Sequence, residues 1–205
     1  MEPNKTGTTT VGLVYKDGVI LAADRRVSAG NMVAHKMDKI APLSDRLGIT
    51  IAGMVGDAQA LVRVMRSEIS LHEIRSGTKM NTREAVGLLG TILFNGRMSL
   101  NLFYTELIAG GFDTKPELYI LDEVGSQIGD EYTVTGSGGV FALGVLQADY
   151  KPEMTEEDAI KLAHKAVSSS LQRDIYTGNG INIVVINKKG YKKLSDEEIA
   201  NALSE

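Results

Sequence analysis

Six short segments of the 205-residue chain contain the polar side chains that could do chemistry. Each has an ordinary structural interpretation when taken alone, such as a strand, a turn, a surface segment or the start or end of a helix. Their hydroxyl groups are weak nucleophiles unless a base lies beside them, so no single segment indicates an enzyme. The six are residues 7–12 (GTTTVG), 24–26 (DRR), 35–40 (HKMDKI), 53–59 (GMVGDAQ), 135–139 (TGSGG) and 173–180 (RDIYTGNG).

The composition excludes several kinds of catalytic and metal-binding chemistry. The chain has no cysteine, which excludes disulfides, thiol catalysis, cysteine-ligated zinc and iron–sulfur clusters. Its three histidines, His35, His72 and His164, are far apart in the sequence and form no HExxH pattern. We therefore expect no metal site and no cofactor.

Glycine-rich segments often bind phosphate groups, but residues 135–139 do not fit the known patterns. No Gly-Lys-Ser/Thr follows them, as a P-loop requires. Phe141 stands where GxGxxG needs its third glycine, and Thr135 stands where GxSxG needs its first. Taken alone, this segment is interpreted as a tight turn that leads into a helix.

Length and charge favour one soluble domain. The formal net charge is −4, which gives no basic footprint for nucleic acid or for an anionic membrane. No apolar run approaches the ~20 residues of a membrane span. The first seven residues are polar and contain no hydrophobic signal region. We expect a single cytoplasmic domain with one large core.

Hydrophobic periodicity predicts strands and helices that are segregated along the chain rather than strictly alternating, which favours an α+β layered domain. The clearest helical stripe is formed by Ala58, Leu61, Val62, Met65 and Ile69. Strands are expected at residues 8–16, 19–24, 32–35, 48–53, 104–111, 117–121, 132–135, 181–186 and near 191. Helices are expected at 57–75, 82–95, 139–146, 155–173 and from 195.

Local signals place the ends of these elements. Asp57 is the expected N-cap of the first helix and Gly77 its C-terminal stop. Thr155 begins a capping-box pattern with an acidic first turn. Asp17-Gly18 and Lys189-Gly190 are the expected turns of two hairpins.

In this order and spacing, the six segments closely resemble those of proteasome β-type subunits of the archaeal kind, within the N-terminal-nucleophile hydrolase superfamily. The resemblance extends from residue 7 to about residue 194. It implies a four-layer αββα sandwich, in which two antiparallel sheets are flanked by helices.

The resemblance also implies a precursor that cuts its own Gly7–Thr8 bond. Residues 1–7 are then a propeptide and residues 8–205 a single catalytic domain. Cleavage gives Thr8 a free α-amine, whose ordinary pKa of about 7.7–8 makes it a better base at neutral pH than a lysine near 10.4. Thr8 would be the nucleophile of a threonine endopeptidase. Gly7 suits the cleavage because a residue without a Cβ atom tolerates a tight backbone.

Further site residues follow from the same resemblance. Lys39 is expected beside Thr8, where its cation lowers the pKa of the nearby amine and hydroxyl. Asp24 is expected to pair with Lys39 and offset its burial. The Gly53 N–H is the expected oxyanion donor. The segment before Lys39 is one residue shorter than in some relatives, which leaves Lys36 as an alternative lysine, but Lys39 followed by an aliphatic residue fits the family motif better.

Two more residues are expected to orient the Thr8 amine and a nearby water, namely Ser137 and Asp174. Thr177 is a secondary member of this group. The family commonly has serine there, so the hydroxyl is kept but a methyl group is added to a packed site.

The resemblance places an apolar specificity pocket beside the nucleophile. It predicts cleavage after hydrophobic or aromatic residues. The expected lining is Val27, Ser28, Ile51 and Val55.

The implied partners are other copies in seven-membered β rings stacked in pairs, α-type ring subunits, a regulatory ATPase and unfolded protein substrates. One alternative is a catalytically silent ring subunit, of inactive β type or of α type. The α type has a helix before the first strand, whereas only seven residues precede Thr8, and an inactive β type would not need the site residues. A second alternative, the bacterial two-component ATP-dependent peptidase, is shorter and lacks the segment at 173–180.

Overall fold

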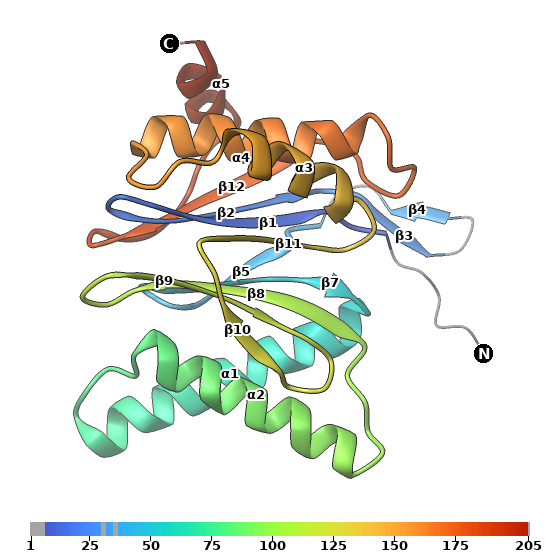
Figure 1. Ribbon diagram of the computed structural model, residues 1–205. Helices are drawn as coiled ribbons and strands as arrows, with labels where there is room; N and C mark the ends of the chain where they lie inside the picture. Colours follow the sequence, from blue (N-terminus) through green and yellow to red (C-terminus); the bar gives the residue numbers. More distant parts are fainter. Residues whose placement is uncertain (1–6, 30–31, 35–36, 205) are drawn as a thin grey trace.

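The computed structural model describes residues 7–29, 32–34 and 37–204, and it describes the backbone but not the side chains of residues 28–29 and 32–34. Two antiparallel sheets lie face to face, and helices cover both outer faces (Figure 1). The expected four-layer α+β sandwich is therefore confirmed.

The first sheet is built around a hairpin. Strands β1 and β2 pair antiparallel from Thr10↔Ala23 to Tyr15↔Gly18. This register makes Lys16 and Asp17 the turn, one residue earlier than the expected Asp17-Gly18. The second hairpin, β12–β13, shows the same offset: Asn187 pairs with Gly190. The strand order is β11 (Tyr132–Thr135), β1 (Thr10–Tyr15), β2 (Gly18–Asp24), β12 (Ile181–Asn187) and β13 (Gly190–Lys193).

The second sheet contains strands that sequence patterns did not indicate. Pro42 interrupts β5, and all three residues of β10 are exposed, so neither shows the alternation typical of a half-buried strand. The expected strand at 48–53 divides at Ile51 into two. The order is β10 (Gln127–Gly129), β9 (Pro116–Leu121), β8 (Thr105–Phe112), β6 (Leu47–Thr50) and β5 (Ile40–Ser44), with β7 (Ala52–Gly53) also on β8, and β3 (Val27–Ala29) pairs with β4 (Met32–Ala34) separately.

Within the described residues, five helices complete the layers. Gly77 ends the first in a left-handed conformation (φ 71°), and its N–H donates to the carbonyl of Glu73, as expected. Thr155 accepts from the N–H of Asp158, which confirms its capping role. Asp57 was wrongly expected as an N-cap: Met54 holds that position, and Asp57 accepts from the N–H of Tyr104 at 3.0 Å. The helices are α1 (Val55–Ser76), α2 (Thr82–Met98), α3 (Gly139–Asp149), α4 (Glu156–Leu171) and α5 (Asp196–Ser204).

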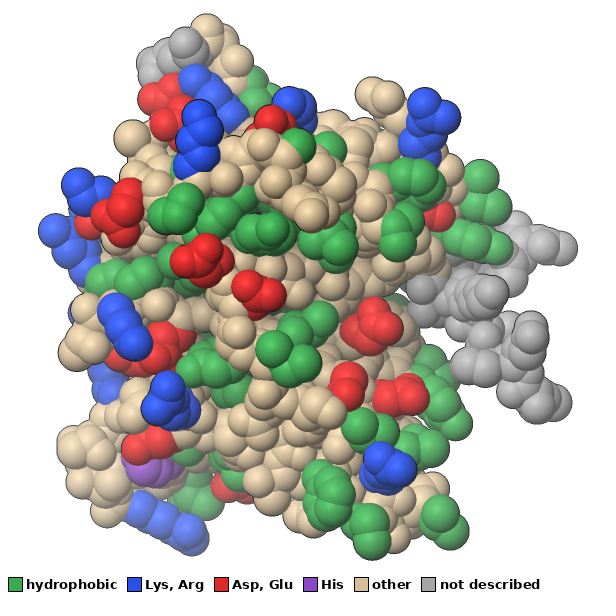
Figure 2. Space-filling model, in the orientation of Figure 1, with side chains coloured by type: hydrophobic (Ala, Val, Ile, Leu, Met, Phe, Trp, Pro, Cys, Tyr) green, Lys and Arg blue, Asp and Glu red, His purple; other side chains and the backbone are tan. Residues whose placement is uncertain are grey.

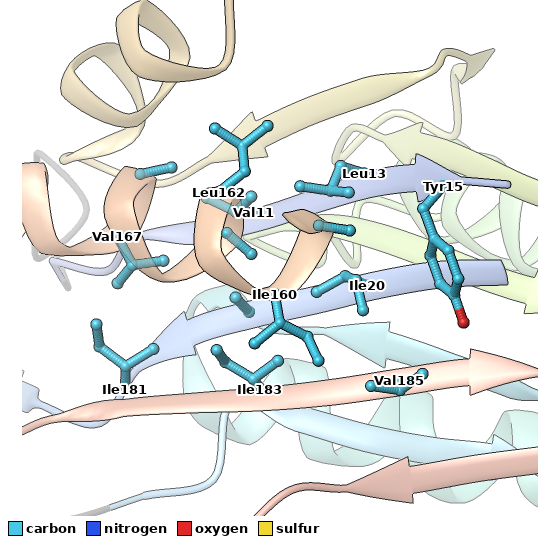
Figure 3. Close-up of a cluster of buried hydrophobic side chains, with 14 of the residues drawn as sticks. Val11, Leu13, Tyr15, Ile20, Ile160, Leu162, Val167, Ile181, Ile183 and Val185 are labelled. Atoms are coloured by element: carbon cyan, nitrogen blue, oxygen red, sulfur yellow. The ribbon is translucent and has the colours of Figure 1, made fainter. Parts of the chain in front are cut away.

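Three layers of buried side chains hold the sandwich together. One lies between α3, α4 and the first sheet, and Figure 3 shows Ile160 and Val167 of α4 facing Ile183 and Ile181 of β12. The second lies between α1, α2 and the second sheet, and it buries the predicted stripe of α1. The third fills the space between the sheets. Among the described residues, no helix combines the length and apolar character needed to cross a membrane.

Three buried threonines link the two sheets and are called here the inter-sheet threonines. Thr10 of β1 and Thr135 of β11 share a hydrogen bond between their hydroxyls. Thr50 of β6 donates to Thr10 at 3.2 Å and accepts from the N–H of Ile108 at 3.1 Å. The chain therefore satisfies these polar atoms without any charge in the middle of the core.

Candidate active site

The β1–β2 hairpin places two of the expected site residues at the same end of the first sheet. Thr8 lies two residues before the start of β1, and Asp24 ends β2. Because Thr10 pairs with Ala23, the chain before Thr10 must run beside the chain after Ala23. The N–H of Asp24 donates to the carbonyl of Thr9 at 3.2 Å.

Lys39 joins these two residues. Its ammonium nitrogen donates to the Thr8 hydroxyl at 2.9 Å and to Asp24 Oδ1 at 2.7 Å. The Lys39 and Asp24 side chains are 3% and 0% exposed. The structure thus brings together the three residues expected at the centre of the site, and the alternative, Lys36, lies outside the described residues.

The Asp24 carboxylate is held by more than the lysine. Its Oδ1 also accepts from the N–H of Thr9, and its Oδ2 accepts from the N–H groups of Arg26 and Gly178, each at 3.0 Å. Such charge-assisted bonds offset the cost of burying a carboxylate. Asp24 is therefore a fixed anion against which Lys39 is oriented.

Burial sets the electrostatics of Lys39. Removal from water lowers its pKa below the ordinary lysine value, and the neighbouring Asp24 charge and hydrogen bond oppose that shift. The nearby Asp174 carboxylate acts in the same direction as Asp24, whereas the Arg26 cation acts with burial. A cation in this position favours the loss of a proton from the Thr8 hydroxyl.

The Thr8 hydroxyl also lies against the peptide bond that precedes it. Oγ1 of Thr8 donates to the carbonyl oxygen of Gly7 at 2.7 Å, and the Thr8 N–H donates to Ser137 Oγ at 3.3 Å. While the Gly7–Thr8 bond is intact, this nitrogen is an amide and cannot act as a base. Gly7 and Thr8 are both buried.

The other expected residues form a hydroxyl–carboxylate network next to Thr8. Asp174 Oδ2 accepts from Ser137 Oγ and from Thr177 Oγ1, both at 2.6 Å. Thr177 Oγ1 also lies 2.8 Å from the hydroxyl of Thr9. Ser137 therefore contacts the Thr8 nitrogen, and Asp174 and Thr177 are linked to it through Ser137. The additional methyl group of Thr177 fits in a buried position.

Residues 135–139 do more than lead into a helix, because their glycines let this segment approach the backbone of residues 8–9 closely. A Cβ atom at Gly136 would lie 2.2 Å from the carbonyl oxygen of Thr8, and its φ of 86° is disfavoured for other residues. A Cβ atom at Gly138 would lie 2.0 Å from the Thr9 hydroxyl. Larger residues here would displace Thr8 or Thr9.

A small pocket opens beside Thr8 and Lys39 and contains Val27, Ile51 and Val55 as expected. Gly53 also lines it, with φ of 101°, and a Cβ atom there would lie 2.2 Å from the Tyr104 carbonyl oxygen. The side chain of Ser28, the fourth expected lining residue, lies outside the described residues. Among the described part of the chain, no group of histidine and acidic residues could hold a metal ion.

Sequence reasoning missed several neighbours of the site. Arg26 and Met37 also line the pocket. Arg26 donates to the carbonyl of Ile175 at 2.8 Å and so fastens the 173–180 segment. A Cβ atom at Gly7 would lie only 1.6 Å from the Cβ atom of Tyr176. Proximity in sequence to the motifs was the available signal for all of these residues.

These features define an α+β sandwich with a buried threonine–lysine–aspartate group at one end of its first sheet. A family model described as proteasome subunit matches residues 4–186. A proteasome subunit beta from Methanocaldococcus vulcanius is 46% identical over 201 residues, which cover 96% of this chain and 89% of the relative.

Two further relatives have similar coverage. A proteasome subunit beta from Methanopyrus kandleri is 43% identical over 97% of this chain and 96% of its own length. A proteasome subunit beta 1 from Thermococcus sibiricus is 44% identical over 96% of this chain and 95% of its own length. The chain belongs to the proteasome subunit family, as the sequence motifs predicted.

Proposed function

We propose that the protein is a threonine endopeptidase, the catalytic β subunit of a proteasome core particle, with Thr8 as its nucleophile after self-cleavage. One observation carries the proposal. The Thr8 hydroxyl accepts from a buried lysine that an aspartate holds, and it lies against the carbonyl of the bond to be cut. A purely structural subunit needs no charged pair in this position.

The first reaction is the removal of residues 1–7. Thr8 Oγ1 attacks the carbonyl carbon of Gly7, a new C–O bond forms, and the C–N bond breaks while its nitrogen takes the hydroxyl proton. Water then hydrolyses the resulting ester, which frees the Gly7 carboxylate and the Thr8 hydroxyl. The 2.7 Å hydrogen bond from Thr8 Oγ1 to the Gly7 carbonyl oxygen supports this step, because it places the hydroxyl beside the carbonyl group that it attacks.

The second reaction is the hydrolysis of substrates by the same hydroxyl. The α-amine of Thr8 takes the hydroxyl proton and passes it to the leaving amine of the substrate, and water hydrolyses the acyl-enzyme. Lys39 favours the deprotonated hydroxyl, and Asp24 orients Lys39. The Gly53 N–H is the proposed oxyanion donor, and Ser137, Asp174 and Thr177 are proposed to orient the amine and a water.

The pocket beside Thr8 supports a preference for apolar substrate residues. Val27, Ile51, Val55 and Met37 supply an uncharged lining. Arg26 and Lys39 are also part of the wall, but both are held by hydrogen bonds to the protein. We propose cleavage after hydrophobic or aromatic residues, and rapid cleavage after lysine or glutamate together with slow cleavage after leucine would overturn this.

Membership of the proteasome family supports assembly into a core particle. We propose seven-membered β rings stacked in pairs, α-type rings at their ends and an ATPase that supplies unfolded chains. The surface is consistent with contacts between subunits: Val140, Phe141 and Leu143 of α3 are all exposed. On the face that carries α3, exposed hydrophobic side chains lie among the charged ones (Figure 2).

The test is the intact mass of the subunit after assembly with an α-type partner, together with hydrolysis of a fluorogenic peptide that ends in an apolar residue. We expect the wild-type chain to lose the mass of residues 1–7 and to hydrolyse the peptide. Thr8→Ala should keep the full mass and lose activity by about 10³-fold or more, the scale seen when a nucleophile is removed. Thr10→Val is the matched control and should be processed.

The alternative of a silent ring subunit gives the opposite result. A fully assembled particle in which the wild-type chain keeps residues 1–7 and hydrolyses no peptide would require the assignment of Thr8 to be withdrawn. Equal activity of wild type and Thr8→Ala would have the same consequence.

A further inference from the structure

Asp24 and Lys39 come from two separate segments, and a single buried side chain touches the residue next to each. This side chain is Asn182, on β12, which is 2% exposed. Its Oδ1 accepts from Arg25 Nε at 2.6 Å, and its Nδ2 donates to Asp38 Oδ1 at 2.8 Å. Arg25 follows Asp24, and Asp38 precedes Lys39.

The position of Asn182 on the sheet is itself fixed. It lies opposite Ala23 in the β12–β2 ladder, next to the Ile181↔Asp24 pair. The bridge therefore connects the end of a rigid strand with the 37–39 segment, which crosses the end of that strand. The only backbone link described between these two segments on this side is the bond from the Met37 N–H to the Arg25 carbonyl at 3.0 Å.

The two ends of the bridge differ in their exposure. Arg25 is largely covered and also donates to Asp196 at the start of α5. Asp38 is exposed and accepts from Lys193 at 2.7 Å, which lowers the pKa of its carboxyl. The Lys193–Asp38 ion pair is open to water and is expected to contribute little, whereas the partner of Asp38 in the other bond, Asn182, is buried.

We propose that Asn182 is a positioning residue for the endopeptidase: its amide bridge between Arg25 and Asp38 sets the separation of Asp24 and Lys39, and hence the place of the Lys39 ammonium at Thr8. This rests on the proposed function of Thr8. An error of about 1 Å in a catalytic group can lower a rate about 10²-fold. The effect should fall on kcat, because none of Arg25, Asp38 and Asn182 lines the pocket beside Thr8.

The experiment compares substitutions at the exposed end of the bridge, so that the core is not disturbed. Asp38→Asn keeps an oxygen that accepts from Asn182, whereas Asp38→Ala removes it. Lys193→Met removes only the exposed ion pair to Asp38. In assembled particles we expect Asp38→Ala to lower kcat about five-fold or more with KM within about two-fold, and Asp38→Asn and Lys193→Met to stay within about two-fold of wild type.

A second measurement exchanges the hydrogen-bond donor and acceptor between positions 182 and 38. Asn182→Asp places a carboxylate against Asp38, so it should lower kcat at least as much as Asp38→Ala. The double variant Asn182→Asp/Asp38→Asn restores a donor opposite an acceptor, with Arg25 still bonded, and should recover kcat to within about three-fold of Asp38→Asn.

The outcomes separate this inference from the proposed function. If wild type is active and Thr8→Ala is not, equal kcat values for Asp38→Ala and Asp38→Asn overturn the role of Asn182 alone. A change confined to KM, or a double variant that is no better than Asn182→Asp, overturns it as well. An inactive wild-type particle would overturn both proposals together.

Discussion

Thr8 and Thr10 are two residues apart on one segment, yet their hydroxyls lie in opposite kinds of environment. The Thr8 hydroxyl contacts a lysine ammonium, and an aspartate holds that ammonium. The Thr10 hydroxyl instead shares hydrogen bonds with the neutral hydroxyls of Thr135 and Thr50. Both threonines are buried, so burial alone does not distinguish them.

The two regions solve the problem of buried polar groups differently. The inter-sheet threonines pair neutral donors and acceptors, which costs little and joins the sheets. The site buries a charged pair, which carries a large desolvation cost and is often no more stable than apolar packing of the same volume. A charged pair beside a hydroxyl is therefore better explained by reactivity than by stability.

The first way to break this comparison is to remove the charge at the site. Lys39→Met should lower both Gly7–Thr8 processing and peptide hydrolysis by about 10²-fold or more, since the hydroxyl loses the group that favours its deprotonation. The fold should survive because three backbone N–H groups still bind the Asp24 carboxylate. Intact mass and peptide hydrolysis in assembled particles measure the effect.

A Lys39→Met particle with wild-type processing would show that the two hydroxyl environments do not differ in function. Thr10→Val again serves as the control, because it removes a buried hydroxyl two residues from Thr8 and leaves Lys39 unchanged.

The second prediction concerns the residue before Thr8, the proposed nucleophile. Gly7→Ala should slow processing about ten-fold or more, because its Cβ atom would lie 1.6 Å from the Cβ atom of Tyr176 and must displace the carbonyl from Thr8 Oγ1. The rate at which the precursor mass disappears measures this. Gly87→Ala is the matched control, since a Cβ atom there would meet nothing within 4 Å.

A chain released directly at Thr8, by cleavage of a removable N-terminal fusion, should have ordinary peptidase activity whatever residue preceded it. If Gly7→Ala is processed at the wild-type rate, steric fit against Tyr176 is not the reason for glycine at this position.

The contrast between the two regions also shows how far sequence reasoning reaches. Periodicity located α1, because its stripe from Ala58 to Ile69 is buried as a unit. It missed β5 and β10, which lack an alternating pattern. Both hairpin turns fell one residue earlier than their glycines suggested, since Gly18 and Gly190 belong to the strands themselves.

The site divides in a similar way. The closeness of Thr8 and Asp24 follows from an antiparallel hairpin, but Ser137 contacts Thr8 from a position more than a hundred residues away, and Asp174 in turn holds Ser137. No local pattern encodes such contacts, and only the family resemblance indicated them. Tyr176 lies within the 173–180 segment but was given no role, and Asn182 lies outside all six segments. Their contacts therefore became visible only in the folded structure.

The third prediction measures the neutral region. Thr10→Val should lower the free energy of unfolding by about 1–3 kcal/mol, because it removes the partner of the Thr135 hydroxyl and the acceptor of the Thr50 hydroxyl in the core. Peptide hydrolysis by the assembled particle should remain within about two-fold of wild type. Thermal or denaturant unfolding of the subunit measures the loss.

Replacing Thr135 as well sharpens the result. Thr10→Val/Thr135→Val removes both partners of one hydrogen bond, so its cost should be smaller than the sum of the two single changes. Strict additivity would mean that the two hydroxyls do not stabilise each other.

The smallest expected effect lies where the two regions meet. Thr177 joins them, because its hydroxyl donates to Asp174 at the site and contacts Thr9 on the segment that continues to Thr10. Thr177→Ser keeps that hydroxyl and removes a buried methyl group, so peptide hydrolysis should change by about two-fold or less while stability falls by about 1 kcal/mol. Thr177→Val keeps the shape and removes the hydroxyl, and it should reduce hydrolysis more than Thr177→Ser does. If the valine variant is the more active of the two, Thr177 belongs with the structural threonines rather than with the site.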